Sequence, residues 1–389
     1  MRIGSKYRVS EKIGGGSFGE VFKGEITTTH EMVAIKLEPT TAVTPQIYQE
    51  AKVYSMLVGG VGIPDFKWHG TEGDYNGIVI ELLGQSIEEM FCMCSRSFSL
   101  KTVLMIADQV LDRVQYMHEK GLIHRDIKPE NFMLGLGQKS NQIYIIDFGL
   151  SKKYRDLKDH THIPFREGRS LTGTARYTSL NTHIGIEQSR RDDIEGIAYM
   201  LIYLLKGCLP WQGLKAKTKS EKNDLIAQKK FATTIDALCE GIPAEFGVLL
   251  NEARRLDFSD RPDYPFYRKI FRDLFIKQGF SYDYNYDWVI LSSSTPRSIL
   301  SAGAGLKDSE SDDFPSHIIS KPQNLAKNDD LLLVPPRVYS TPNLIPPSNN
   351  ERQNNTFRDQ RVLSRKSRVR AYSKQIYGIP KKPTFGEDN

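Results

Sequence analysis

The sequence has few cysteines, no long apolar segment and little net charge. Four cysteines in 389 residues are too few for the dense disulfide framework of a small secreted domain, so we expect reduced thiols and a cytoplasmic or nuclear location. The longest apolar run, Ile197 to Leu205, has nine residues, whereas about 18 to 20 are needed to span a bilayer. The first residues resemble no signal segment and neither end offers a lipidation site, so we expect no membrane anchor.

The small positive charge lies almost entirely near the C-terminus. The chain has 53 Lys and Arg against 47 Asp and Glu, a formal charge of +6, and residues 292–389 hold 15 of these bases and 10 of these acids. A nucleic-acid-binding module would need basic residues interleaved with stacking aromatics. The near-neutral first 291 residues therefore make nucleic acid an unexpected partner.

Residues 292–389 also differ in composition from the rest of the chain. They hold ten of the 19 prolines, placed among Ser, Asn and charged residues with little periodicity. Such a segment cannot bury enough apolar surface to offset the entropy lost on ordering. We therefore predict a disordered regulatory tail over 292–389.

Residues 1–291 contain two kinds of hydrophobic pattern. Alternation with β-branched and aromatic residues predicts strands at 7–13, 19–26, 32–37 and 77–82. Apolar spacings of three and four predict helices at 45–56, 100–117, 192–205, 222–230, 235–238 and 244–255. The order predicts an α+β fold with two lobes, a small β-rich lobe at 1–83 and a larger helical lobe at 84–291.

A glycine-rich motif, G-x-G-x-x-G-x-V, lies between the first two predicted strands. Its glycines permit a tight turn in which backbone N–H groups approach phosphate oxygens. On its own the motif is weak evidence, because a glycine-rich hairpin without a ligand is about as common. Its residues are Gly14, Gly15, Gly16, Ser17, Phe18, Gly19, Glu20 and Val21.

Three further motifs follow in order. The third predicted strand ends in Val-Ala-Ile-Lys at Lys36, and Glu50 in the next predicted helix is its candidate partner. His-Arg-Asp-Ile-Lys-Pro-Glu-Asn occupies 124–131, and Asp-Phe-Gly occupies 147–149 after a strand-like run. Together with the glycine-rich motif, they resemble the signature set of protein kinases.

This resemblance implies phosphoryl transfer from ATP with Mg²⁺, a reaction that depends on positioning and charge neutralisation. It implies that Asp126 is the catalytic base, that Lys128 stabilises the transferring group, that Asn131 and Asp147 hold Mg²⁺, and that Lys36 and Glu50 position the nucleotide. It also implies nucleotide contacts from the glycine-rich motif, Lys36 and six other residues, namely Ile13, Ala34, Glu81, Leu83, Met133 and Ile146.

Longer motifs resemble one kinase family, casein kinase 1, across about 285 residues. They include Gly-Gly-Val-Gly-Ile-Pro at 59–64, Leu-Thr-Gly-Thr-Ala-Arg-Tyr at 171–177, His-Ile-Gly-Ile-Glu-Gln-Ser-Arg-Arg-Asp-Asp at 183–193 and Leu-Pro-Trp-Gln-Gly-Leu at 209–214. Ser179-Leu180-Asn181 stands where many kinases have Ala-Pro-Glu. The end of the chain lacks the cysteine pair of the membrane-anchored branch, so the soluble delta/epsilon-like branch is more similar.

The family resemblance implies a monomeric enzyme whose protein substrates carry a phosphorylated or acidic residue three positions before the target Ser or Thr. Arg176 and Lys222 match the phosphate-binding positions of the family, and both side chains suit a dianion. Arg125, Lys152 and Arg169 match a second anion-binding cluster, beside an activation segment that the resemblance implies is active without phosphorylation. We interpret the other lysines between 215 and 230 as a solvated helix face.

Two features of the predicted tail suggest regulation. Ser292, Thr295, Ser298 and Ser301 are spaced by three, so each phosphate could prime the next site, and we hypothesise an autophosphorylated, inhibitory ladder; accidental spacing is the alternative. Residues 361–382 hold eight Lys or Arg and no acid, which suits either nuclear import or a merely soluble segment.

A catalytically inactive kinase fold acting as a scaffold is the alternative function. The sequence argues against it, because all four residues that such a scaffold would be expected to lose are present: Lys36, Asp126, Asn131 and Asp147.

Overall fold

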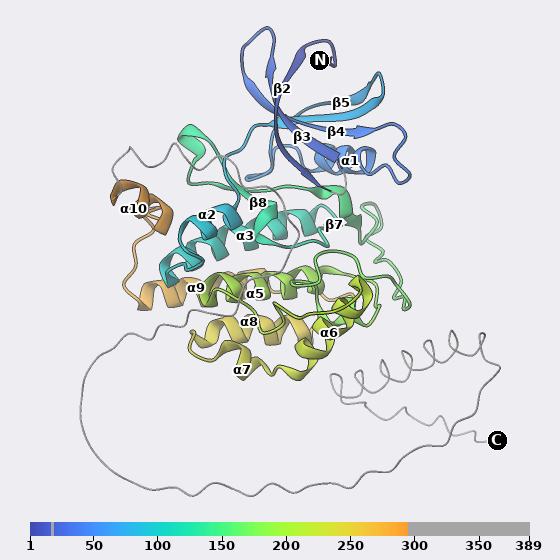
Figure 1. Cartoon of the computed structure of the whole chain (residues 1–389). Helices are drawn as coiled ribbons and strands as arrows, with labels where there is room; N and C mark the ends of the chain where they lie inside the picture. Colours follow the sequence, from blue (N-terminus) through green and yellow to red (C-terminus); the bar gives the residue numbers. More distant parts are fainter. Residues whose placement is uncertain (17–18, 295–389) are drawn as a thin grey trace, which may run out of the picture. The chain divides into compact units, whose positions relative to one another are not determined.

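The computed structural model describes residues 1–16 and 19–294, which form a β-rich lobe and a helical lobe (Figure 1). This two-lobed α+β architecture confirms the fold predicted from the sequence. Ser17, Phe18 and the predicted tail features beyond Ser294 lie outside the described residues.

The smaller lobe is a six-stranded antiparallel sheet with strand order β1-β2-β3-β4-β6-β5. The predicted strands are all present, whereas β1 and β5 were not predicted. In β5 the side chains are half-buried or exposed without clean alternation, so it lacks the period-2 pattern on which the prediction depended. The bounds are β1 (Arg2–Ile3), β2 (Tyr7–Gly16), β3 (Gly19–Ile26), β4 (Met32–Pro39), β5 (Phe66–Glu72) and β6 (Tyr75–Glu81), with one helix, α1 (Ile47–Leu57), after β4.

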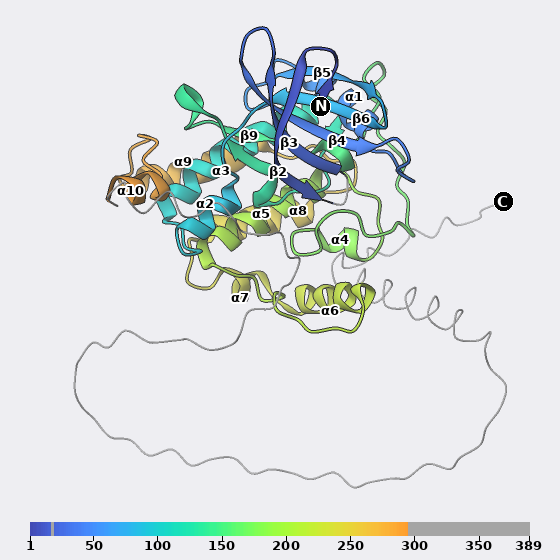
Figure 2. The ribbon, with the colours of Figure 1, turned by 45° about the horizontal axis from the view of Figure 1, so that its top comes forward.

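The larger lobe is built around α3 (Leu100–Glu119) and α5 (Arg190–Lys206) (Figure 2). Residues 190–204 of α5 are all buried, which makes this helix the centre of the lobe. The other helices are α2 (Ile87–Met93), α4 (Leu180–His183), α6 (Lys219–Ala232), α7 (Ile235–Cys239), α8 (Ala244–Arg255), α9 (Tyr264–Lys277) and α10 (Asp287–Ser294). Among the described helices, none combines the length and the apolar character needed to cross a bilayer.

Short strands and 3-10 turns lie between α3 and α4, where the predicted catalytic motifs fall. The pairs are β7 (Leu122–Ile123) with β10 (Lys152–Lys153) and β8 (Phe132–Leu134) with β9 (Ile143–Ile145). The 3-10 turns are η1 (Pro129–Asn131), η2 (Gly137–Lys139) and η3 (Phe148–Leu150). These short elements hold one motif on each side of the β8–β9 hairpin.

Helix α10 extends into the predicted tail. Residues 292–294 belong to this helix, and Ser292 donates its hydroxyl to Trp288 O at 2.7 Å. The first hydroxyl of the hypothesised ladder is therefore part of a helix, where Ser commonly bonds to the carbonyl four residues earlier.

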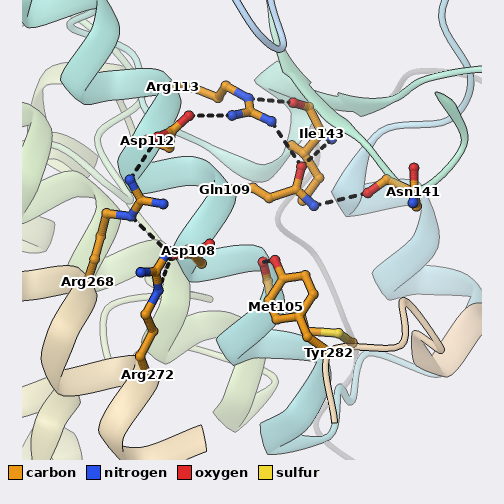
Figure 3. Close-up of polar contacts among 10 residues, drawn as sticks. All are labelled: Met105, Asp108, Gln109, Asp112, Arg113, Asn141, Ile143, Arg268, Arg272 and Tyr282. Atoms are coloured by element: carbon orange, nitrogen blue, oxygen red, sulfur yellow. Dashed lines mark hydrogen bonds and ion pairs between the residues drawn. The ribbon is translucent and has the colours of Figure 1, made fainter.

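A polar network joins α9 to α3 and α3 to the strand before the Asp-Phe-Gly motif (Figure 3). Arg268 forms ion pairs with Asp108 at 3.0 Å and Asp112 at 2.8 Å, one turn apart on α3. Arg113, next to Asp112, donates from Nε to Ile143 O at 3.0 Å. The network therefore fixes β9, and with it the start of the Asp-Phe-Gly motif, against the helical core.

The Gly-Gly-Val-Gly-Ile-Pro motif packs onto the same arginine. Gly62 accepts a hydrogen bond from Ile145 N at 2.9 Å and has a φ of +73°. A Cβ at this position would lie 2.0 Å from Arg113 Nε and 2.5 Å from Ile143 O. Glycine is needed here for both conformation and space.

We expect Gly62→Ala to lower the free energy of unfolding by about 2–4 kcal/mol, because left-handed strain and overpacking add together. Gly59→Ala is the matched control: Gly59 has a φ of +81° and nothing within 4 Å of its Cβ position, so only the strain remains. Urea denaturation of both variants measures the difference. Equal losses would contradict the packing argument.

Candidate active site

A buried lysine joins two carboxylates from different elements. Lys36 on β4 contacts Glu50 of α1 at 2.7 Å and Asp147 at 3.2 Å. Burial lowers the pKa of Lys36, but the charges of Glu50 and Asp147 outweigh it and raise the pKa. Glu50 is 3% exposed. The structure thus brings together three predicted site residues around one charged ammonium group.

The position of Asp147 depends on the residue after it. Phe148 is fully buried, with its ring 4.8 Å from Tyr54 of α1 in an edge-to-face arrangement. Asp147 itself has a φ of 62°, a left-handed backbone conformation that is strained for a residue other than glycine. Burial raises the pKa of Asp147, but the positive charges of Lys36 and Lys128 outweigh it and lower the pKa. The carboxylate is therefore held ionised.

Four polar groups contact oxygen atoms of Asp126, two from its own loop at 124–131 and two from Thr174. Lys128 Nζ lies 3.1 Å from Asp126 Oδ2, and Asn131 donates from Nδ2 to Asp126 O at 2.8 Å. Thr174 donates to Asp126 Oδ1 from its backbone N at 2.7 Å and from its hydroxyl at 2.8 Å. Oδ1 is thus held by Thr174, and Oδ2 is the oxygen that faces Lys128.

Asp193 of α5 holds the loop that carries Asp126. It accepts hydrogen bonds from His124 N at 2.7 Å and Arg125 N at 2.9 Å, and its Oδ2 lies 2.9 Å from His118 Nε2. Arg125 has a φ of 71°, a strained conformation that must be stabilised by the surrounding structure. Asp193 provides this stabilisation by accepting hydrogen bonds from the backbone N–H groups of the loop. This role was not predicted from the sequence, although paired acids at the start of an otherwise apolar helix are an unusual pattern that indicates a buried polar function.

The predicted nucleotide contacts come from five places in the chain. The β2–β3 hairpin pairs Gly14 with Val21, Gly15 with Glu20 and Gly16 with Gly19. In this hairpin Ile13 is 49% exposed, and a Cβ on Gly19 would lie 2.5 Å from Leu37 O. The remaining predicted contacts are Ala34 on β4, Glu81 at the end of β6, Leu83 just beyond it, Met133 on β8 and Ile146 after β9. Ala34 is paired with Ile80 of β6.

The oxygen donors near Asp147 suit a hard cation. Asn131 uses its amide N–H on Asp126 O, which leaves its amide oxygen as the available ligand, and Asp147 supplies a carboxylate. In the described part of the chain, no group of three or more His, Cys, Asp or Glu side chains could hold a metal alone. A cation at Asn131 and Asp147 would therefore complete its coordination with phosphate and water oxygens, as Mg²⁺ usually does.

The predicted second anion cluster already contains an anion from the chain itself. Glu187, 3% exposed, contacts Lys152 at 2.9 Å and Arg169 at 3.1 Å. Arg125, the third predicted member, donates from Nε to Leu150 O at 2.6 Å. The role of Glu187 was not predicted from the sequence, because its two ion pairs join segments that are distant in sequence.

The two predicted phosphate-binding residues lie on neighbouring elements. Arg176 follows Thr174 in the segment before α4, and its guanidinium lies 5.6 Å from the ring centres of Tyr177 and Tyr203. Lys222 lies in the first turn of α6. Thr218 is the N-cap residue of α6, and its side chain accepts a hydrogen bond from Glu221 N.

The family model for the protein kinase domain matches residues 7–269. The match covers more than half of the chain and includes every predicted site residue. The chain belongs to the protein kinase family. Members of this family transfer phosphate from ATP with the help of a divalent metal, in agreement with the chemistry that the site geometry can support.

Proposed function

We propose that the chain is a Ser/Thr protein kinase of the casein kinase 1 type that phosphorylates acidic or phosphate-primed substrates. The observation that favours an active enzyme over an inactive scaffold is the ion pair of Lys36 with Glu50, which must be formed for the nucleotide to be positioned. Asp147 lies beside this pair, 3.2 Å from Lys36, where its carboxylate would be available to Mg²⁺. The motifs at 59–64, 171–177, 183–193 and 209–214 support the family branch.

In this proposal Asp126 and Lys128 act on the transferred group. Asp126 Oδ2 accepts the hydrogen bond of the substrate hydroxyl and takes its proton as the new O–P bond forms and the bond to the ADP oxygen breaks. Lys128, 3.1 Å from Asp126, offsets charge that develops on the phosphoryl oxygens. Mg²⁺, when bound by Asn131 and Asp147, would neutralise phosphate charge.

The preference among substrates would depend on positively charged side chains that lie after residues 124–131 in the sequence. A phosphorylated residue three positions before the target carries a dianion, which Arg176 and Lys222 would bind through charge-assisted hydrogen bonds. An acidic residue would be a weaker substitute, since it has one negative charge and fewer acceptor oxygens.

We expect wild-type enzyme to prefer a peptide with phosphoserine three residues before the target serine over the same peptide with alanine there. Arg176→Ala or Lys222→Ala should lower the ratio of the two kcat/KM values by about tenfold each, the usual effect of one charge-assisted contact. Lys219→Ala, on the same helix, is the matched control. Steady-state transfer from ATP measures the ratio, and no preference in the wild type would contradict the proposed specificity.

The proposed enzyme acts as a monomer in the cytoplasm, the nucleus or both. We also propose that autophosphorylation of the segment after α10 lowers its activity, by placing a phosphorylated residue in the site that substrates use. Deleting residues 292–389 should then raise activity relative to the autophosphorylated full-length enzyme, with phosphatase-treated full-length enzyme as the control. No change on deletion would contradict this hypothesis.

A further inference from the structure

Helix α6 has one lysine that is not part of a solvated face. Lys230 is 1% exposed, which corrects the sequence-based interpretation for this residue. Its Nζ donates to Ala175 O at 2.9 Å and to Thr178 O at 2.5 Å. The same ammonium lies 4.7 Å from the ring centre of Tyr199 and 5.1 Å from that of Trp211.

This burial is costly for a lysine. None of the carboxylates in the described part of the chain forms an ion pair with Lys230. Burial lowers the pKa of Lys230 well below its ordinary value, and the charge of Glu195 offsets only part of this effect. When a lysine side chain is moved out of water without an ionic partner, its charged form is disfavoured. Methionine would fill the same space without that cost, so the two hydrogen bonds are the property that lysine adds.

Both carbonyls belong to the short segment that carries Arg176. Trp211 donates from Nε1 to Arg176 O at 2.8 Å, between the two carbonyls held by Lys230. The first residue of this segment, Thr174, is fixed to Asp126. Lys230, Trp211 and Asp126 therefore all form hydrogen bonds with the peptide groups around Arg176.

Lys230 also links this segment to the helix that carries Lys222. The two lysines are eight residues apart in α6, which is about 12 Å along a helix. The hydrogen bonds of Lys230 therefore set where the start of α6 lies relative to Arg176. A change in this contact would change the spacing between Arg176 and Lys222 without touching either.

We propose that Lys230, together with Trp211, is a specificity-determining positioning residue that sets the spacing of Arg176 and Lys222 for a phosphorylated substrate residue. The inference rests on the proposed substrate preference of the enzyme. The hydrogen bonds of Lys230 and Trp211, which touch no substrate, would then influence the discrimination between primed and unprimed substrates.

The test compares Lys230→Met with Lys229→Met, which removes the neighbouring charge from the exposed side of the same helix. Lys230→Met should lower the primed-to-unprimed ratio of kcat/KM by about tenfold, through a higher KM for the primed peptide, whereas Lys229→Met should leave the ratio unchanged. Trp211→Phe, which removes one hydrogen bond and keeps an aromatic ring, should lower the ratio by a smaller factor and provides a second variant if Lys230→Met does not fold.

A second comparison separates positioning from a general structural defect. In an Arg176→Ala background, Lys230→Met should cause no further loss of the ratio, because the group it positions is gone. If Lys230→Met and Trp211→Phe lower kcat/KM equally for primed and unprimed peptides, or leave the ratio unchanged, the inference is overturned. A preference of the wild type for the primed peptide would still support the proposed function. Absence of preference in the wild type would overturn both.

Discussion

Asp126→Asn should lower kcat for transfer to a peptide serine by about 10²- to 10⁴-fold, the range that a positioned general base contributes. The amide cannot take the proton of the attacking hydroxyl. It would also turn either an oxygen or an NH₂ group toward Lys128, which now lies 3.1 Å from a carboxylate oxygen. The KM for ATP should change little, since Lys36, Glu50 and Asp147 remain.

The control is Thr174→Val, which keeps the backbone hydrogen bond to Asp126 Oδ1 and removes the hydroxyl bond of 2.8 Å. It should lower kcat by about tenfold, the value of one hydrogen bond to a charged group. Single-turnover transfer with saturating ATP measures both variants. An Asp126→Asn enzyme with wild-type kcat would mean that another group is the base.

The sequence predicted the candidate catalytic groups because each lies in a short local motif. Lys36 and Glu50 are 14 residues apart and separated by one strand end and one loop, so their pairing followed from element order. The groups that hold them were not predictable in the same way. Thr174 is 48 residues from Asp126, and Asp193 is 69 from His124, so only the folded chain brings them together.

The missed secondary structure has similar physical causes. Helix α2 was not predicted because its seven residues are too few to show a clear helical periodicity. Its capping box of Ser86 and Glu89 is nevertheless a helix start signal that is visible in the sequence. Helix α9 begins with Tyr264 and Pro265 and has mostly aromatic residues on its buried face, which suggest strand as readily as helix. In α6, charge alone suggested exposure for Lys230, whereas tertiary contacts bury it.

Glu187→Gln should lower kcat by about tenfold or more in enzyme that carries no phosphate on its activation segment. The variant keeps the shape of the side chain and removes the charge that lies 2.9 Å from Lys152 and 3.1 Å from Arg169. Breaking a fully buried pair costs about 3–5 kcal/mol, but Lys152 and Arg169 are 30% and 46% exposed, so solvent screening reduces the loss to about 1–2 kcal/mol.

The expected loss follows from the position of these cations. Arg125 precedes Asp126, the proposed catalytic base, and donates to Leu150 O just after the Asp-Phe-Gly motif. Lys152 lies on β10, which pairs with β7 before the loop that carries Asp126. In many kinases a phosphate on the activation segment binds such cations and orders the segment. Here the carboxylate of Glu187 contacts Lys152 and Arg169, so we expect this side chain of the protein itself to order the segment without phosphorylation.

Glu167→Gln is the matched control, because Glu167 lies in the same segment and is exposed, and it should retain wild-type kcat. A second variant distinguishes lost charge from lost packing. Glu187→Ala leaves space for an anion, so added sulfate, compared with chloride at equal ionic strength, should restore part of its kcat, whereas Glu187→Gln should not respond. Full activity of Glu187→Gln would show that the cations order the segment without an anion. Loss without sulfate rescue in Glu187→Ala would assign the effect to packing, since a dianion supplies the charge that Lys152 and Arg169 need but not the shape of the glutamate side chain.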